Sequence, residues 1–193
     1  MERKDKKTLI KSGILALALI VLDQLTKYIA VKTLKNQPAI PIIKDVFELK
    51  YLENTSAAFG MDPVSLLHQT FKFDVFANSP EIYLAVRMGF FYIFTFVMIF
   101  VFIWVFVKIP KNNRMLPLDY ILIFLMSGAV GNLIDRASQQ YVVDFLYFKL
   151  IDFPIFNVAD IYVTCSAIAL LVFGVFYYKD EDFDLIFQKK KEK

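Results

Sequence analysis

Four apolar stretches dominate this sequence and restrict what it can fold into. Residues 88–107, 120–134 and 161–178 contain no charged side chain, and residues 12–31 are almost as apolar. A helix needs about 20 such residues to cross the roughly 30 Å hydrocarbon core of a bilayer. With 58% hydrophobic residues and 21 Phe in 193 residues, the chain has more apolar surface than a soluble domain would need. We therefore predict an all-α membrane protein, a single integral domain over residues 1–193, with four transmembrane helices at about 12–31, 85–107, 118–135 and 158–178.

Basic residues gather in three segments that flank these helices: residues 3–11, residues 108–114 and residues 189–193. Such segments usually face the cytoplasm, which predicts cytoplasmic N- and C-termini and places residues 32–84 and 136–158 outside. The net charge of +3 is therefore a signal of topology, and no basic patch interleaved with aromatics points to nucleic acid. Because no small-residue cleavage site follows the first apolar stretch, we expect a retained helix and not a cleaved signal peptide.

The first external segment has the pattern of a half-buried strand. Phe47, Leu49 and Tyr51 alternate with charged residues, which is the period of two typical of a strand with one apolar face. Residues 62–63, Asp-Pro, are a typical start of a short helix. We expect a small β-strand and short-helix segment whose apolar faces rest on the outer leaflet and close over a substrate.

Two aspartates stand where a membrane protein tolerates idle charge least. Asp144 lies in Tyr-Val-Val-Asp-Phe within the second external segment, and Asp160 ends Phe-Asn-Val-Ala-Asp at the start of the last apolar stretch. A charge near the bilayer core costs roughly 2.5–3.5 kcal/mol on insertion scales, so such groups usually pair, line a cavity or act chemically. Two neighbouring carboxylates share one proton: the ionised acid activates a water, and the protonated acid polarises a carbonyl. The pair predicts aspartyl proteolysis without a metal or a cofactor.

Other hydrolytic chemistries lack their residues. The chain has one His, His68, and one Cys, Cys165, so neither a zinc cluster nor a Cys/His pair can be assembled. A Ser/Lys dyad would need Ser56 or Ser127 beside Lys27, and no sequence pattern places either serine there. Carboxylates remain as the candidate catalytic groups.

Several polar residues have a structural interpretation. Asp23 and Lys27 are four residues apart on one helical face and can neutralise each other. Asp135 can form a helix-end ion pair with Arg136. Asp160, three residues after an Asn, can also serve as a helix cap.

Five ordered motifs between residues 23 and 160 resemble those of lipoprotein signal peptidase, also called signal peptidase II. They are Asp-Gln-Leu-Thr-Lys at 23–27, Asn-Thr-Ser-Ala-Ala-Phe-Gly at 54–60, Gly-Asn-Leu-Ile-Asp-Arg at 131–136, Val-Val-Asp-Phe at 142–145 and Phe-Asn-Val-Ala-Asp at 156–160. This family consists of four-helix aspartyl endopeptidases of the bacterial inner membrane. They cut the signal peptide from a prolipoprotein just before its lipid-modified cysteine, and the cyclic peptide globomycin blocks them.

The resemblance implies a role for each matching residue. Asp144 and Asp160 would be the catalytic pair, and Asn54, Asn132, Arg136 and Asn157 would hold substrate and orient the carboxylates. Asp23, Lys27 and Asp135 remain structural polar residues in this interpretation. The implied partners are diacylglyceryl prolipoproteins, membrane lipid and a globomycin-type inhibitor, but no nucleic acid, and we expect a monomer. The sequence departs from the family at Ser56, where Gly is usual.

Two other functions are compatible with parts of the sequence. A small transporter or channel would use intramembrane Asp, Asn and Lys residues to line a pathway. Against this alternative, the polar residues gather near one face of the membrane and form no ladder through it. A non-catalytic membrane scaffold would have no use for two converging acids.

Overall fold

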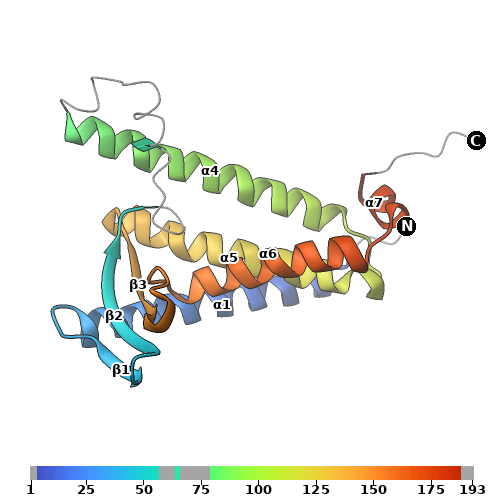
Figure 1. Cartoon of the computed structure of the whole chain (residues 1–193). Helices are drawn as coiled ribbons and strands as arrows, with labels where there is room; N and C mark the ends of the chain where they lie inside the picture. The colour runs from blue at the N-terminus through green and yellow to red at the C-terminus, as the bar shows by residue number, and fades with distance from the viewer. Residues whose placement is uncertain (1–3, 57–63, 66–78, 188–193) are drawn as a thin grey trace, which may run out of the picture.

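The computed structural model describes residues 4–56, 64–65 and 79–187 (Figure 1). Four long helices form a bundle, a small sheet lies at one end of it, and the short last helix lies at the other end. Within the described residues, four helices are long and apolar enough to cross a membrane, which confirms the predicted fold class. The elements are α1 (Lys6–Leu34), β1 (Ile40–Ile43), β2 (Phe47–Asn54), α4 (Pro80–Lys108), η2 (Asn113–Met115), α5 (Leu116–Gln139), β3 (Val142–Phe148), η3 (Lys149–Ile151), α6 (Val158–Phe176) and α7 (Asp180–Phe187).

Local signals explain where these helices begin. Asp5 caps α1, because its side chain accepts a hydrogen bond from the backbone N–H of Thr8 at 2.8 Å. Helix α4 begins with Pro80, whose missing N–H costs nothing at a first helical position. The 19 residues of α6 extend about 28 Å, close to the hydrocarbon thickness, so its first turn lies at the edge of the apolar layer.

Helix α5 is the centre of the bundle and packs against the other three spans. In its most apolar stretch 50% of the residues are buried, compared with 11% in α4. Gly128 permits the close approach of α6, because a Cβ at this position would lie 2.6 Å from the carbonyl oxygen of Ala159. Small residues at a helix contact allow backbones to pack closely in membranes. The start of α6, which carries Asp160, is therefore fixed against α5.

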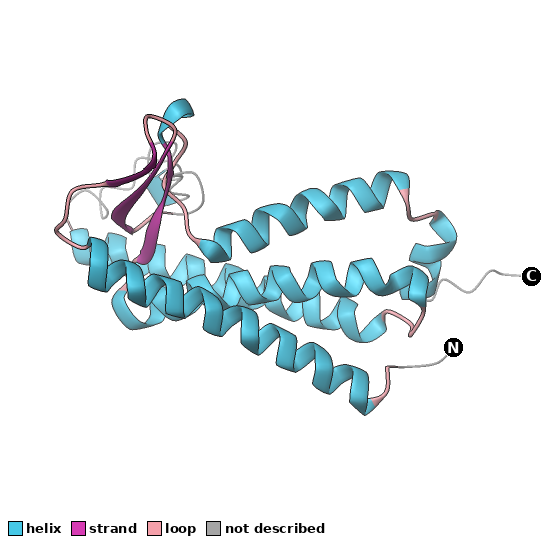
Figure 2. Ribbon diagram, turned by 90° about the horizontal axis from the view of Figure 1, so that it is seen from below, coloured by secondary structure: helices cyan, strands magenta, loops and turns pink. Residues whose placement is uncertain are grey.

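The sheet has three antiparallel strands in the order β1-β2-β3 and projects from one side of the bundle end (Figure 2). Leu52 is opposite Asp144, and Asn54 is opposite Val142. Because side chains alternate along a strand, this register puts Asn54 and Asp144 on the same face of the sheet. The predicted strand is confirmed as β2, whereas β3 was not predicted.

The apolar face of β2 packs on protein and not on lipid. Leu49 and Tyr51 contact a buried cluster that includes Ala30 and Leu34 at the end of α1, together with Val143 of β3. The expectation that this face rests on the membrane is wrong for these two residues, because the end of α1 extends beyond the apolar stretch and covers them. The predicted helix start at residues 62–63 lies outside the described residues.

Candidate functional site

Asp144 lies in the middle of β3 and has no solvent-exposed surface. Two amide groups donate to its carboxylate: Asn54 Nδ2 at 2.7 Å and Asn157 Nδ2 at 2.6 Å. Asn54 is itself held, since its Oδ1 accepts the backbone N–H of Ser56 at 2.8 Å. Each oxygen of this buried carboxylate therefore has a fixed donor, as a buried acid requires.

Asp160 lies in the first turn of α6, where Asn157 is the N-cap. The Asn157 side chain accepts from the backbone N–H of Asp160, and the Asp160 side chain accepts from the backbone N–H of Asn157. This capping box accounts for the helix start and confirms that Asp160 serves as a cap. The second oxygen of Asp160 accepts from Asn132 Nδ2 on α5 at 2.8 Å, so the carboxylate is also oriented from a neighbouring helix.

Asn157 connects the two acids. Its Nδ2 donates to Asp144, and its backbone N–H donates to Asp160 at 3.1 Å. The same Nδ2 also lies 3.1 Å from Oδ1 of Asn132. Residues from β2, β3, α5 and α6 therefore meet in one hydrogen-bonded network, and the two aspartates that the sequence singled out lie in it together.

The environment of Asp144 favours its protonated form. Burial, followed by the charge of the nearby Asp160, raises the pKa of Asp144 to about 7 against the lowering effect of its two amide donors. A carboxyl group in this state can donate a proton at neutral pH. The pair therefore has the properties required for one acid and one base.

Arg136 faces this network from α5 without forming the predicted ion pair. Its Nη2 donates to the backbone oxygen of Ser56 at 3.1 Å, and its guanidinium lies 4.6 Å from the ring centroid of Phe91. The prediction that Asp135 pairs with Arg136 is wrong, because Asp135 pairs with Lys27 of α1 at 3.2 Å. Arg136 instead fixes the chain that follows Asn54.

The ion pair expected between Asp23 and Lys27 is present at 3.0 Å. Lys27 also donates to Asn132 Oδ1 at 2.9 Å. The sequence interpretation missed Gln24, whose Nε2 lies within 3.2 Å of Asp23 and within 3.0 Å of Asp135. Its position between Asp23 and Lys27 in the first motif is the signal that could have identified it.

Cys165 and Ser127, which a thiol or a Ser/Lys mechanism would need, take no part in this hydrogen-bonded network. Cys165 is exposed on α6, and Ser127 donates to the carbonyl oxygen of Ile123 in its own helix at 2.7 Å. Because Lys27 is held by Asp23, Asp135 and Asn132, no Ser/Lys dyad forms between Ser127 and Lys27. His68 lies outside the described residues.

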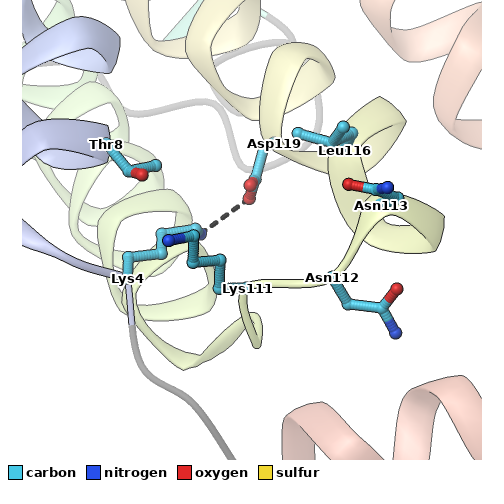
Figure 3. A pocket seen from close by; sticks show the side chains of 7 residues that line it. All are labelled: Lys4, Thr8, Lys111, Asn112, Asn113, Leu116 and Asp119. Carbon is cyan, nitrogen blue, oxygen red and sulfur yellow. Dashed lines mark hydrogen bonds and ion pairs between the residues drawn. The ribbon is translucent and has the colours of Figure 1, made fainter.

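Cavities at both ends of the bundle are lined by described residues. One cavity of about 410 Å³ lies between α4 and the end of α5. Its lining residue Tyr92 donates to the carbonyl oxygen of Arg136 at 2.9 Å, which places the cavity near the network that Arg136 faces. The other, of about 390 Å³, lies at the opposite end of the bundle beside the Lys4–Asp119 ion pair (Figure 3). Neither of these two cavities is lined by a predicted site residue.

The family model of signal peptidase (SPase) II matches residues 15–176, which include the whole network. A lipoprotein signal peptidase of Caldanaerobacter subterraneus subsp. tengcongensis is 38% identical over 152 residues, covering 78% of this chain and 86% of that protein. A lipoprotein signal peptidase of Brevibacillus brevis is 37% identical over 163 residues, covering 84% of this chain and 93% of that protein. A bacterial membrane enzyme solved by the in meso method at 1.9 Å resolution has a TM-score of 0.69 and 27% identity, covering 92% of this chain and 99% of that chain.

These similarities agree with the geometry of the network and give no support to a transporter or channel. Both the family match and the relatives extend over most of the chain, and the family match includes the helices that carry Asn132 and Asp160. Because the family model matches residues 15–176 and four helices are apolar enough to cross a membrane, the chain is a multi-pass membrane peptidase that belongs to the signal peptidase II family.

Proposed function

We propose that this protein removes signal peptides from prolipoproteins by cutting just before the diacylglyceryl-modified cysteine, with Asp144 and Asp160 as the catalytic pair. The observation that carries the proposal is the single network in which Asn157 donates to both carboxylates. A merely structural Asp160 would need only its capping box. The additional donor from Asn132, and the buried acid on a separate strand, are what a two-acid site requires.

The two environments divide the roles. Asp160 lies at the positive end of the α6 dipole and retains partial access to solvent, so of the two acids it is the better anion. It takes a proton from water as the water oxygen bonds to the scissile carbonyl carbon. Asp144, protonated near neutral pH, donates a hydrogen bond to the carbonyl oxygen. When the C–N bond breaks, the proton on Asp160 passes to the leaving nitrogen, which balances the reaction.

The four polar neighbours orient this pair and hold the substrate. Asn54 and Asn157 fix the carboxylate of Asp144, and Asn132 fixes that of Asp160. Arg136 fixes the backbone at Ser56 and brings a positive charge to the site, where it can neutralise charge on the tetrahedral intermediate. Loss of a contact that holds substrate should raise KM, and loss of a contact that orients a carboxylate should lower kcat.

The site faces the outside of the bacterial inner membrane in this proposal. Among the described residues, the basic segments 4–11 and 108–114 lie at the end of the bundle opposite the sheet, which supports a cytoplasmic location for that end. Exposed apolar side chains also lie at the end of β1 and in η3. Ile42, Ile43, Leu150 and Ile151 are 55–68% exposed and form a surface suited to the outer leaflet. Lipid chains of the substrate can then stay in the bilayer while the peptide reaches the acids.

Cleavage of a purified prolipoprotein tests this function. The full chain in detergent or liposomes is incubated with a diacylglyceryl prolipoprotein, and mass spectrometry locates the new N-terminus. We expect a shortened product that begins with the modified cysteine, and much slower cleavage of the same precursor without its lipid. Globomycin should inhibit the reaction, and light scattering in detergent should give the mass of one chain.

Failure to cut the lipidated precursor would contradict the proposed function, provided that the protein is folded. Equal cleavage of both precursors would reject the lipid requirement and keep the peptidase activity. The Asp144→Asn variant serves as the inactive control for contaminating proteases.

A further inference from the structure

A buried carboxylate holds the backbone immediately before each catalytic aspartate. Asp135 accepts the N–H of Val143 at 3.0 Å, one residue before Asp144. Asp23 accepts the N–H of Ala159 at 2.9 Å, one residue before Asp160. Strand β3 and helix α6 are thus fixed by the same kind of contact at corresponding positions. The distance between the two acids depends on where these two carboxylates lie.

Lys27 joins the two holding carboxylates. Its Nζ lies 3.0 Å from Asp23 and 3.2 Å from Asp135, and its side chain is only 3% exposed. A third contact extends toward the catalytic pair: Nζ donates to Asn132 Oδ1 at 2.9 Å, and Asn132 Nδ2 donates to Asp160 at 2.8 Å. One polar residue therefore separates the ammonium from a catalytic acid.

The packing around this cluster leaves little freedom. A Cβ on residue 131 would lie 2.5 Å from Asp23 Oδ2, so Gly131 is required for the carboxylate to reach Ala159. Gln24 donates to the carbonyl oxygen of Gly131 at 3.1 Å and closes the cluster on the side of α5. A cluster fixed in this way can transmit a defined position to both catalytic elements.

The charge balance of the site gives Lys27 a second effect. Its ammonium lowers the pKa of Asp144, in opposition to burial and to Asp160. Among the described residues, four carboxylates share the site with the two cations Lys27 and Arg136, so each cation matters for how many acids stay ionised. Among the described residues, the charged and titratable groups that face the pair or its holding carboxylates are Asp23 and Lys27 on α1, Tyr92 on α4, Asp135 and Arg136 on α5, and Tyr162 on α6.

We propose that Lys27 is a positioning residue for the catalytic pair, which it serves in two ways: it joins the carboxylates that hold Val143 and Ala159, and its charge, placed behind Asn132, keeps one of the two acids ionised. The proposal rests on the proposed function, since it assumes that Asp144 and Asp160 perform the reaction. It assigns to the first motif a role in setting the working pH range and not only in folding.

The test compares the pH dependence of kcat/KM for wild type, Lys27→Gln, Lys27→Met and Lys27→Arg on one lipidated precursor. Removal of a nearby positive charge makes ionisation of the catalytic pair less favourable. In Lys27→Gln and Lys27→Met the acidic and basic limbs should therefore move to higher pH by roughly one unit. Maximal kcat should fall while KM stays within about twofold, because Lys27 does not touch the substrate. Lys27→Arg keeps the charge and should keep both limbs at the wild-type pH.

Thermal unfolding in detergent, measured on the same samples, separates positioning from folding. Folded neutral variants whose limbs stay at the wild-type pH would overturn the proposal. So would neutral variants that do not fold while Lys27→Arg is folded with unmoved limbs, since Lys27 would then be purely structural. In each of these cases wild-type cleavage and an inactive Asp144→Asn would leave the proposed function intact.

Discussion

The two ends of the bundle both contain buried charge, but they arrange it differently. At the end with α7, each of the two buried acids has its own cation: Lys4 pairs with Asp119 at 2.7 Å, and Arg114 pairs with Asp182 at 2.7 Å. At the end with the sheet, Lys27 is shared by two acids. Among the described residues, no ion pair reaches Asp144 or Asp160, whose carboxylates are held by amides and backbone N–H groups.

This difference separates buried acids that are held in ion pairs from buried acids that are held by neutral donors. An acid paired with its own cation stays ionised and cannot cycle a proton near neutral pH. An acid held by neutral donors beside another acid can exist in either state. The capping box of Asp160 shows that a structural role and an available carboxylate are compatible in one residue, because each oxygen has its own partner.

Replacing the acids one at a time is expected to give the largest effect. Asp144→Asn or Asp160→Asn keeps the shape of the side chain but cannot exchange a proton, so kcat/KM should fall roughly 10³-fold or more. Cleavage of a lipidated precursor by folded variants in detergent measures this loss.

The matched control is Asp119→Asn at the other end of the bundle. It removes an acid of the same kind from a closed pair, so it should lower the unfolding temperature and leave the activity of the folded fraction near wild type. If Asp144→Asn kept turnover within tenfold of wild type, the distinction between the two ends would be wrong.

Asn157 offers a smaller and more selective effect, because its two functions can be separated. Asn157→Ser keeps a good N-cap for α6 but removes the Nδ2 donor to Asp144, and activity should fall about 10–100-fold with little loss of stability. Asn157→Ala removes the cap as well and should cost about 1 kcal/mol of additional stability. Equal activity of Asn157→Ser and wild type would show that the amide does not orient Asp144.

The raised pKa of Asp144 also predicts how stability depends on pH. The folded state binds this proton up to a pKa of about 7, whereas the unfolded chain releases it near the ordinary Asp value of 3.8. Unfolding then releases a proton between these values, so this contribution to stability is present below pH 3.8 and lost as pH rises through 7. The unfolding temperature of wild type should decline more between pH 5 and pH 8 than that of Asp144→Asn, in the same detergent. Parallel curves would contradict the assignment.

The four helices could be predicted from the sequence because a membrane span must be apolar over its whole length. That property can be read from the residue types alone, without knowing which elements pack together. The sequence also predicted β2 from its alternation. It missed β3, although the run from Val142 to Phe148 is rich in β-branched and aromatic residues, because the strand is buried on both sides near Asp144 and shows no alternation.

The site shows the same limit. Helical spacing was sufficient for the Asp23–Lys27 pair, since both residues lie on one helix. The partner of Asp135 could not be read from spacing, because Lys27 lies on another helix, more than 100 positions away in the chain. Contacts between elements depend on how α1 and α5 pack, and the neighbouring Arg136 gave a misleading local alternative.

Close packing of α6 on α5 gives a moderate expected effect that is independent of charge. A methyl group at residue 128 would lie 2.6 Å from the carbonyl oxygen of Ala159, so Gly128→Ala should push the first turn of α6 outward and cost about 1–3 kcal/mol. Activity should fall as well, because Asp160 moves with this turn. Gly174→Ala is the control, since a Cβ there meets nothing within 4 Å. Comparable unfolding temperatures of the two variants would contradict the role of this contact.

Replacement of both members of a buried ion pair by apolar residues should have the smallest effect on stability and activity. It tests directly whether the end with α7 only stabilises the fold. Lys4 pairs with Asp119, and its ammonium also donates to the carbonyl oxygen of Phe106 and lies over the ring of that residue. Lys4→Met/Asp119→Leu removes both charges of the pair together. Such exchanges are often neutral or stabilising, whereas removal of one partner alone costs about 3–5 kcal/mol. We therefore expect the double variant to unfold within a few degrees of wild type, Lys4→Met alone to be clearly less stable, and both to cleave precursor normally once folded. Loss of activity in a stable double variant would show that the end with α7 influences the acids across the membrane, and the division between a stabilising and a reactive end would fail.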